Sequence, residues 1–202
     1  MKGSITCSSR YGIEDILSCL LDRETYAMSK GNPSTYESCI ELRNGVEVFL
    51  RPISPEDMNL ITDLFNKLSP RSRYLRFMTH LRELPEELLH RFTHLDHASE
   101  FALACLVEED GRDAIIAVGR YALDPNENIA DLALVVRDDW QHRGLGKSLL
   151  SKIIAIGKEH GISRFGSVMD PQNDIMKQTL RELGCQVKYD FRNGSCQVEI
   201  VV

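Results

Sequence analysis

One stretch in the second half of the chain constrains the fold more than any other. Residues 129–136 are almost all apolar, as in a buried strand, and residues 145–160 repeat apolar side chains at helical spacing. The loop between them carries the pattern Gln-x-x-Gly-x-Gly, formed by Gln141, Gly144 and Gly146. We therefore expect a strand, a short glycine-containing loop and a helix in direct succession.

This loop is suited to bind an anion. Glycines leave the main chain free of side chains, so several amide N–H groups can point at one spot. A helix that begins there adds its unpaired N–H groups and the positive end of its dipole, which favours a phosphate or pyrophosphate. The spacing is not that of a Walker loop, and the third glycine of a dinucleotide-binding loop is absent. A loop that only turns the chain tightly is the alternative.

Capping and turn signals divide the rest of the chain into further elements. Ser54-Pro55 and Ser69-Pro70 each place an N-cap before a proline at the first helical position, and Asp110-Gly111 is typical of a hairpin turn. A third helix follows Pro85. The expected strands are 46–51, 100–107, 114–123, 164–169, 185–191 and 197–202, and the expected helices include 55–68 and 173–183.

The order of these elements predicts a mixed sheet. Strands 100–107, 114–123 and 129–136 follow one another as an antiparallel meander. The helix at 145–160 is a crossover connection, which asks for a parallel pair between strands 129–136 and 164–169. The expected fold class is therefore α+β (α/β), with a mixed central sheet that is flanked by helices.

Residues 1–44 have the pattern of an N-terminal helical appendage and linker, followed by one domain at 45–202. Residues 29–38 are typical of a linker. An apolar stripe on the preceding helix is formed by Ile13, Ile16, Leu17, Leu20 and Leu21. The stripe packs against the main domain, forms a dimer contact or covers the active site as a lid. The sequence leaves these alternatives and the oligomeric state open.

Charge and composition exclude several classes of partner. A net charge of −6 argues against nucleic acid, because proteins that bind it normally carry a basic face. No apolar run approaches the roughly 20 residues that span a bilayer, and residues 1–10 lack an apolar signal region, so we expect neither a membrane partner nor export. The six cysteines form no Cys-x-x-Cys pair, and a hairpin at Asn193-Gly194 would keep Cys185 from bonding to Cys196. Reduced thiols in the cytoplasm are the expected state.

Three histidines raise the question of a metal site. His90, His94 and His97 are spaced so that a helix could bring them to one face. Asp96 is close, but no Glu or Cys completes the ligand set. We expect no bound metal, and expect these histidines to be exposed or to act as caps.

The loop pattern resembles motif A of the GNAT superfamily of N-acetyltransferases, whose loop holds the pyrophosphate of acetyl-CoA. Three segments are similar to the acetyltransferase domain of Pat-type protein lysine acetyltransferases: Leu-Arg-Pro-Ile at 50–53, Ser-Arg-Tyr-Leu-Arg-Phe at 72–77 and Val-Val-Arg-Asp-Asp-Trp-Gln-x-Arg-Gly-Leu-Gly at 135–146. The resemblance covers about residues 46–202. It implies the GNAT fold, in which the parallel strands splay apart where acetyl-CoA enters.

The resemblance also implies which residues contact acetyl-CoA. Backbone N–H groups of the splayed strand, by position those of Leu134 and Val136, would serve the oxyanion and the pantetheine arm. Asn173 matches an Asn that reaches the coenzyme, or else it only caps its helix. The loop and first helical turn complete the set with Gln141, His142, Arg143, Gly144, Leu145, Gly146 and Lys147.

Acetyl transfer to an amine needs a base, because a lysine amine with a pKa of about 10.4 is almost fully protonated at neutral pH. Pat-type domains place a Glu ten residues before the Gln of motif A, and Asp131 stands at this position. Asp is one methylene shorter, which favours action through a bridging water. An acid inside an apolar strand is costly unless it is partnered or used. We expect Asp131 to be the base or proton relay, with a structural ion pair as the alternative.

Together with these residues, the resemblance implies an acetyl-CoA-dependent N-acetyltransferase that transfers acetyl directly to a primary amine, with a protein lysine as the acceptor. A small amine such as a polyamine is one alternative. A non-catalytic acyl-CoA-binding sensor is another, because the acid is short and the Tyr that many members use as general acid is replaced by Met176, Lys177 and Gln178. The segment with Arg71, Arg73 and Arg76 either braces the coenzyme, guides an acidic partner or forms a solvated helical face.

Overall fold

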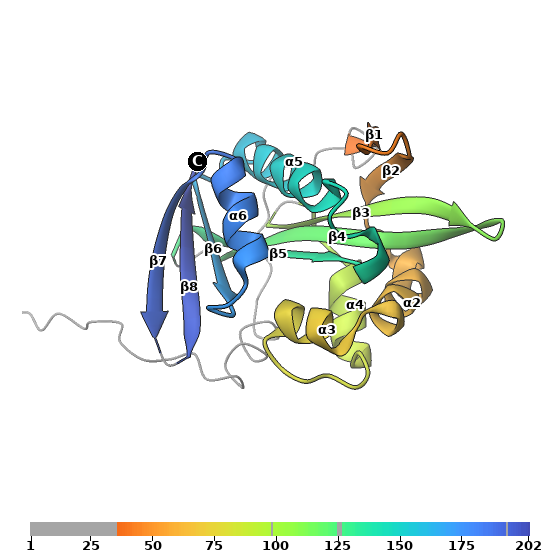
Figure 1. Ribbon diagram of the computed structural model, residues 1–202, viewed down its shortest axis with the longest axis horizontal. Coiled ribbons are helices and arrows are strands. Elements are labelled where there is room, and N and C mark those ends of the chain that lie inside the picture. The colour runs from red at the N-terminus through yellow and green to blue at the C-terminus, as the bar shows by residue number, and fades with distance from the viewer. Residues whose placement is uncertain (1–35, 98, 125–126, 193) are drawn as a thin grey trace, which may run out of the picture.

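A computed structural model describes residues 36–97, 99–124, 127–192 and 194–202. One eight-stranded sheet, in the order β1-β2-β3-β4-β5-β6-β8-β7, runs through the molecule (Figure 1). Its strands are β1 (Ser38–Glu41), β2 (Glu47–Pro52), β3 (Glu100–Glu109), β4 (Arg112–Asp124), β5 (Ile129–Val136), β6 (Arg164–Met169), β7 (Gln186–Arg192) and β8 (Ser195–Val201). Among the strands of this described part, only β5 and β6 pair in parallel. The mixed sheet expected from the sequence is confirmed.

The helices also follow the expected order. They are α2 (Met58–Lys67), α3 (Pro70–Phe77), α4 (Glu86–Thr93), α5 (Leu145–Glu159) and α6 (Asp174–Glu182), with short 3₁₀ turns η2 (Pro55–Asp57) and η3 (Asp138–Trp140). The Ser69 side chain accepts a hydrogen bond from the backbone N–H of Ser72, as its predicted N-cap role requires. The helix expected from Pro55 begins instead as the 3₁₀ turn η2.

The sheet begins earlier in the chain than expected. All four residues of β1 pair with β2 in the antiparallel direction, from Ser38 opposite Leu50 to Glu41 opposite Glu47. Leu42, which follows β1, is 5% exposed and packs in the core. The predicted helix at 13–21 and most of the predicted linker lie outside the described residues. The predicted boundary between residues 44 and 45 therefore stays a prediction. Residues 38–41 of the predicted N-terminal segment already belong to the sheet.

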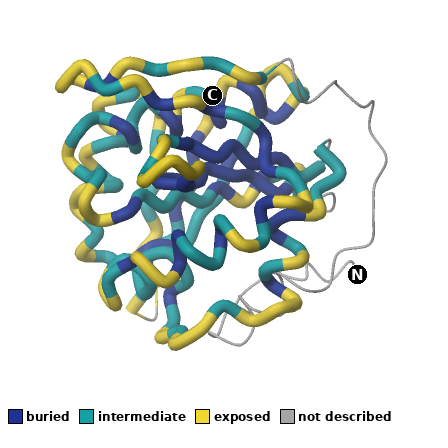
Figure 2. The backbone as a smooth tube through the Cα atoms, turned by 90° about the vertical axis from the view of Figure 1, so that its right-hand side faces the viewer, coloured by how far each residue is buried: buried dark blue, intermediate teal, exposed yellow. Residues whose placement is uncertain are grey.

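Helices cover both faces of the sheet. In Figure 1, α5 and α6 lie on one side, and α2, α3 and α4 lie on the other. Strand alternation produces this arrangement: Ala117 and Tyr121 of β4 belong to the core cluster that contains α5, whereas Val118 belongs to the cluster that contains α2. Figure 2 shows the buried strands in the middle of the molecule. No helix of the described part of the chain has the length and apolar character needed to cross a membrane.

The parallel strands separate soon after they meet. β5 and β6 pair only at Ala130 with Phe165 and at Asp131 with Gly166. On its other edge, β5 pairs with β4 along its whole length, from Ile129 to Val136. Most of β5 therefore has one open edge, which faces the gap toward β6.

Candidate functional site

A cleft of about 1040 Å³ lies where β5 and β6 separate. Its walls include residues 131–136 of β5, residues 166–169 of β6, the glycine loop, and parts of α3 and α6. The cleft thus combines the open edge of β5 with the glycine loop that is predicted to bind an anion.

Two backbone amides stand at the open edge of β5. The N–H of Arg137, the residue directly after β5, donates to the carbonyl oxygen of Ile116 in β4 at 2.8 Å. This N–H group therefore points toward β4. Because N–H groups of successive strand residues point to opposite edges, those of Val136 and Leu134 point away from β4, into the gap. Their direction suits the roles that the sequence predicts for them.

The glycine loop is folded back on the end of this strand. The Gln141 side-chain amide donates to the carbonyl oxygen of Val136 at 2.9 Å and to the hydroxyl of Ser72 at 3.3 Å. Gly144, the N-cap of α5, has φ of 86°, a left-handed conformation that glycine adopts without strain. A Cβ on Gly146 would lie 3.5 Å from a methyl carbon of Val136. The first turn of α5 therefore sits directly over the end of β5.

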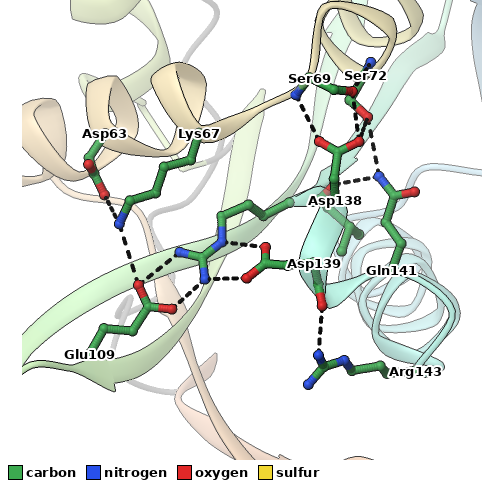
Figure 3. Close-up of polar contacts among 11 residues, drawn as sticks. Asp63, Lys67, Ser69, Ser72, Glu109, Asp138, Asp139, Gln141 and Arg143 are labelled. Carbon is green, nitrogen blue, oxygen red and sulfur yellow. Dashed lines mark hydrogen bonds and ion pairs between the residues drawn. The ribbon is translucent and has the colours of Figure 1, made fainter.

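Asp138 ties the loop to α3 (Figure 3). Its carboxylate accepts hydrogen bonds from the N–H of Ser69 at 2.8 Å and from the hydroxyls of Ser69 and Ser72, both at 2.7 Å. Burial alone would raise the pKa of Asp138, but these hydrogen bonds hold it below its usual value. The ionised carboxylate fixes the start of the loop against the N-terminus of α3, where the helix dipole also favours it.

Arg137 anchors the same segment from the opposite side. It is 5% exposed, and its guanidinium donates to both oxygens of Glu109 and to Asp139, at 2.7 Å in the shorter of its two bonds to Asp139. Lys67 joins the network through Glu109 at 3.4 Å (Figure 3). The hydrogen bonds and charge of Arg137 lower the pKa of Glu109 to about 2. A buried, fully paired arginine thus holds the loop in place.

Most of the predicted coenzyme residues line the cleft. They are Leu134, Val136, Gln141, His142, Gly144, Gly146, Lys147 and Asn173. Arg143 does not: its guanidinium stacks over the Trp140 ring at 4.7 Å and donates to the carbonyl oxygen of Asp139. Leu145 is 1% exposed in the core, so only its backbone could serve a ligand.

Asn173 has a structural role that sequence reasoning left as an alternative. Its side chain accepts a hydrogen bond from the N–H of Met176 at 3.2 Å and so caps α6. The residue also lines the cleft, so capping and coenzyme contact are compatible.

Asp131 points into the cleft from the face of the sheet that carries α3 and α4. Glu100, Ala122 and Asp131 lie opposite one another across β3, β4 and β5. Asp131 is exposed, so the cost that the sequence suggested for an acid inside an apolar strand does not arise from burial here. The strand is apolar on its α5 face, but Asp131 faces an open cleft rather than a covering helix.

The arginines at positions 71 to 76 separate into different roles. Arg73 donates to the carbonyl oxygens of Phe65 and Asn66 at the end of α2, which is a structural cap. Arg76 lies half-buried in the cleft wall with its guanidinium 5.0 Å from the Phe77 ring centre. Burial and the charge of Arg120 lower the pKa of Arg76, whereas Asp131 raises it. The sequence did not reveal that Arg76 lies close enough to Asp131 for their charges to interact, because the two are far apart in the chain.

The histidines do not gather around a common point. His90 and His94 stack with ring centres 3.7 Å apart, whereas His97 lies edge-on to Phe101. Among the described residues, no three His, Cys, Asp or Glu side chains form a group that could hold a metal ion.

The splayed parallel pair with a glycine loop at its mouth is the arrangement of an N-acetyltransferase of the GNAT type. The sequence model of the Acetyltransferase (GNAT) family matches residues 61–185. The chain belongs to this family.

Two relatives narrow the likeness. The chain is 30% identical over 143 residues to Acetyltransferase PA5475 of Pseudomonas aeruginosa, covering 71% of this chain and 77% of that protein. It is 27% identical over 146 residues to Acetyltransferase Pat of Mycolicibacterium smegmatis, covering 72% of this chain and 43% of that protein. The chain therefore matches less than half of the length of the second relative.

Solved structures agree with the family assignment. The GNAT domain of S. lividans PAT is 29% identical, with a TM-score of 0.77 over 85% of this chain and 100% of that domain. The acetyltransferase yncA of Salmonella typhimurium, whose structure contains acetyl-CoA, shares the fold with a TM-score of 0.57 at 16% identity, over 77% of this chain and 92% of that one. The protein is thus an N-acetyltransferase with acetyl-CoA as its donor, and it resembles the Pat type.

Proposed function

We propose that this protein transfers acetyl from acetyl-CoA to the side-chain amine of a protein lysine, with Asp131 as the base or proton relay. The observation that carries this proposal is the cleft itself, in which the open-edge amides of β5, the glycine loop and the Asp131 carboxylate meet. The similarity to Pat-type acetyltransferases supports a lysine acceptor.

The geometry suggests a direct transfer. The pyrophosphate would bind at the glycine loop, and the pantetheine arm would run along β5 with its amide near the N–H of Val136. The N–H of Leu134, on the same edge, would stabilise the oxyanion that forms when the amine attacks the thioester. Asp131 would accept the amine proton, directly or through water. Thiolate then leaves, and its reference pKa of about 8.5 makes it a tolerable leaving group without a general acid.

A decisive experiment supplies labelled acetyl-CoA and the protein to a cell extract and identifies the modified acceptors by mass spectrometry. Labelled lysines in proteins support the proposal, whereas label found only in small amines favours the polyamine-like alternative. Asp131→Asn should reduce acceptor-dependent CoA release by about 100-fold or more. Asp113→Asn, an exposed β4 acid away from the cleft, is the matched control and should leave the rate unchanged.

Two observations favour the sensor alternative. The acid at 131 is short, and among the described residues of α6 no Tyr is present to protonate the leaving thiolate. Tight acetyl-CoA binding without turnover on any amine would establish that alternative. We also propose a cytoplasmic location, since four cysteines of the described region, Cys39, Cys105, Cys185 and Cys196, are free.

A further inference from the structure

The turn between β1 and β2 holds an arginine at the outer end of the glycine loop. The N–H of Leu42 donates to the carbonyl oxygen of Val46 at 2.8 Å, and the N–H of Gly45 donates to that of Leu42 at 2.9 Å. Leu42 itself is buried in the core. The backbone that carries Arg43 is therefore fixed, while the Arg43 side chain is exposed.

The Arg43 side chain reaches the N-cap of α5. Its Nε lies 3.7 Å from where a Cβ on Gly144 would stand, and Arg43 lines the same cleft as Gly144 and Lys147. In Figure 1, β1 and the turn after it lie toward the same end of the molecule as the N-terminal end of α5. A cation is thus placed next to the amides that the phosphate seat requires.

A carboxylate, that of Glu182, lies close to Lys147 and near Arg43. Glu182 of α6 pairs with Lys147 of α5 at 3.2 Å and accepts a hydrogen bond from Gln178 at 2.8 Å. The pKa of Glu182 is lowered by Gln178 first, then by Lys147, and also by the charge of Arg43. This part of the cleft therefore attracts negative charge before any ligand is present.

The Lys147–Glu182 pair is weak enough to be displaced. Both side chains are 40% exposed, and exposed ion pairs contribute little to stability. A phosphate group carries more charge and offers more acceptor oxygens than one carboxylate, and it would also gain the N–H groups at the start of α5. Exchange of Glu182 for phosphate is thus favourable.

We infer that Arg43 binds a phosphate group of the coenzyme together with Lys147, and that Glu182 competes with this phosphate. The inference rests on the proposed placement of the pyrophosphate at the glycine loop. It adds a binding residue that lies ahead of the region matched by the family, residues 61–185.

The first test compares dissociation constants for CoA by calorimetry in the chain of residues 1–202. Arg43→Gln should weaken binding by about five- to tenfold, the range expected for one exposed charge-assisted contact. Arg112→Gln, an exposed arginine of β4 that does not line the cleft, removes the same charge and should bind as wild type does. The loss at Arg43 should shrink as salt is added, because the contact is exposed.

The second test concerns Glu182, whose removal should change the affinity for CoA in the opposite direction. Glu182→Gln removes the negative charge and frees Lys147, so CoA should bind about two- to threefold more tightly. A merely structural role of Glu182 between α5 and α6 would weaken binding instead, and that result would overturn the competition.

Dephospho-CoA, which lacks the 3′-phosphate, identifies the phosphate that is bound. If Arg43→Gln weakens CoA but not dephospho-CoA, Arg43 binds the 3′-phosphate; equal losses assign it to the pyrophosphate. Equal affinity of Arg43→Gln, Arg112→Gln and wild type for CoA would refute the inference while leaving the acetyltransferase assignment intact. Failure of the wild-type protein to bind CoA would refute both, so the two failures are distinguishable.

Discussion

His160, at the C-terminal end of α5, lies between two tyrosine hydroxyls. Its Nε2 is 2.7 Å from the hydroxyl of Tyr36, and its Nδ1 is 2.5 Å from that of Tyr121. A neutral imidazole has one donor and one acceptor nitrogen, so the two hydroxyls satisfy both. Burial lowers the pKa of His160, although nearby Glu159 acts in the opposite direction. The folded protein therefore favours the neutral ring.

This environment predicts a pH dependence of stability. The unfolded chain binds a proton at His160 near pH 6.5, where the folded chain still excludes it. The stabilisation is thus complete above about pH 6.5 and is lost as the pH falls through the lower folded pKa. Urea unfolding of wild type and His160→Gln between about pH 7.5 and pH 5.5 should show a smaller loss for the variant. Burial also lowers the pKa of His97, which contributes to the loss in both proteins, so the informative quantity is the difference between wild type and variant. Equal losses of stability in the two proteins would contradict the prediction.

Gly144 is a second position where one residue decides local behaviour. Its φ of 86° is unfavourable for any residue with a Cβ, at a cost of about 1–2 kcal/mol. Gly144→Ala should therefore destabilise the fold modestly and weaken acetyl-CoA binding, because the seat amides shift. Gly111→Ala is the control: φ is 73° and no atom lies within 4 Å of its new Cβ, so it should share the stability loss without the affinity loss. Calorimetric binding and urea unfolding of both variants measure the two effects separately.

At the scale of elements, the contact between α5 and β6 is very close. A Cβ on Gly157 would lie 2.5 Å and 2.9 Å from two ring carbons of Phe165. Only a glycine lets the helix approach the sheet so closely, and α5 borders the coenzyme cleft at its other end.

Gly157→Ala should push α5 away from β6. Overpacking of a well-packed contact destabilises by about 1–3 kcal/mol, more than the helix propensity of alanine returns. Ser151→Ala, at an exposed position of the same helix, should be neutral or slightly stabilising. The midpoint of urea unfolding measures both variants, and a Gly157→Ala protein as stable as wild type would show that Phe165 gives way easily.

Local signals explain which elements the sequence could predict. The strand at 129–136 and the strand at 164–169 were placed with their observed bounds, because apolar runs and flanking turns define them locally. β1 was missed because four residues with alternating exposure give too weak a pattern. Its presence in the sheet depends on pairing with β2, which is a tertiary effect.

The site was predictable only in part for the same reason. The glycine loop and the two amides follow from sequence order and strand alternation. The hydrogen bonds that hold the loop in place do not follow from local sequence. Arg137 bonds to Glu109, 28 residues away in the chain, and Asp138 bonds to Ser69, 69 residues away. The exposure of Asp131 depends on how the helices cover its face of β5, which no local pattern reveals.

At the scale of the whole molecule, the start of the folded unit is a question about β1. This strand forms one edge of the sheet and covers β2, while Leu42 and Tyr36 pack against the core cluster behind it. The structure therefore favours a folded unit that includes residues 36–44 rather than one that begins at residue 45.

Two truncations test this boundary. Removal of residues 1–35 should leave the thermal unfolding midpoint and its increase with acetyl-CoA close to those of the full chain, because β1, Tyr36 and Arg43 remain. Removal of residues 1–44 deletes β1 and the buried Leu42, so stability should fall by about 2 kcal/mol or more from the lost apolar burial alone. The same truncation also removes Arg43, so the shift with acetyl-CoA should shrink as well. If the chain from residue 45 matches the full chain in both measurements, β1 contributes nothing to the folded unit. The boundary between residues 44 and 45 that the sequence predicts would then be correct.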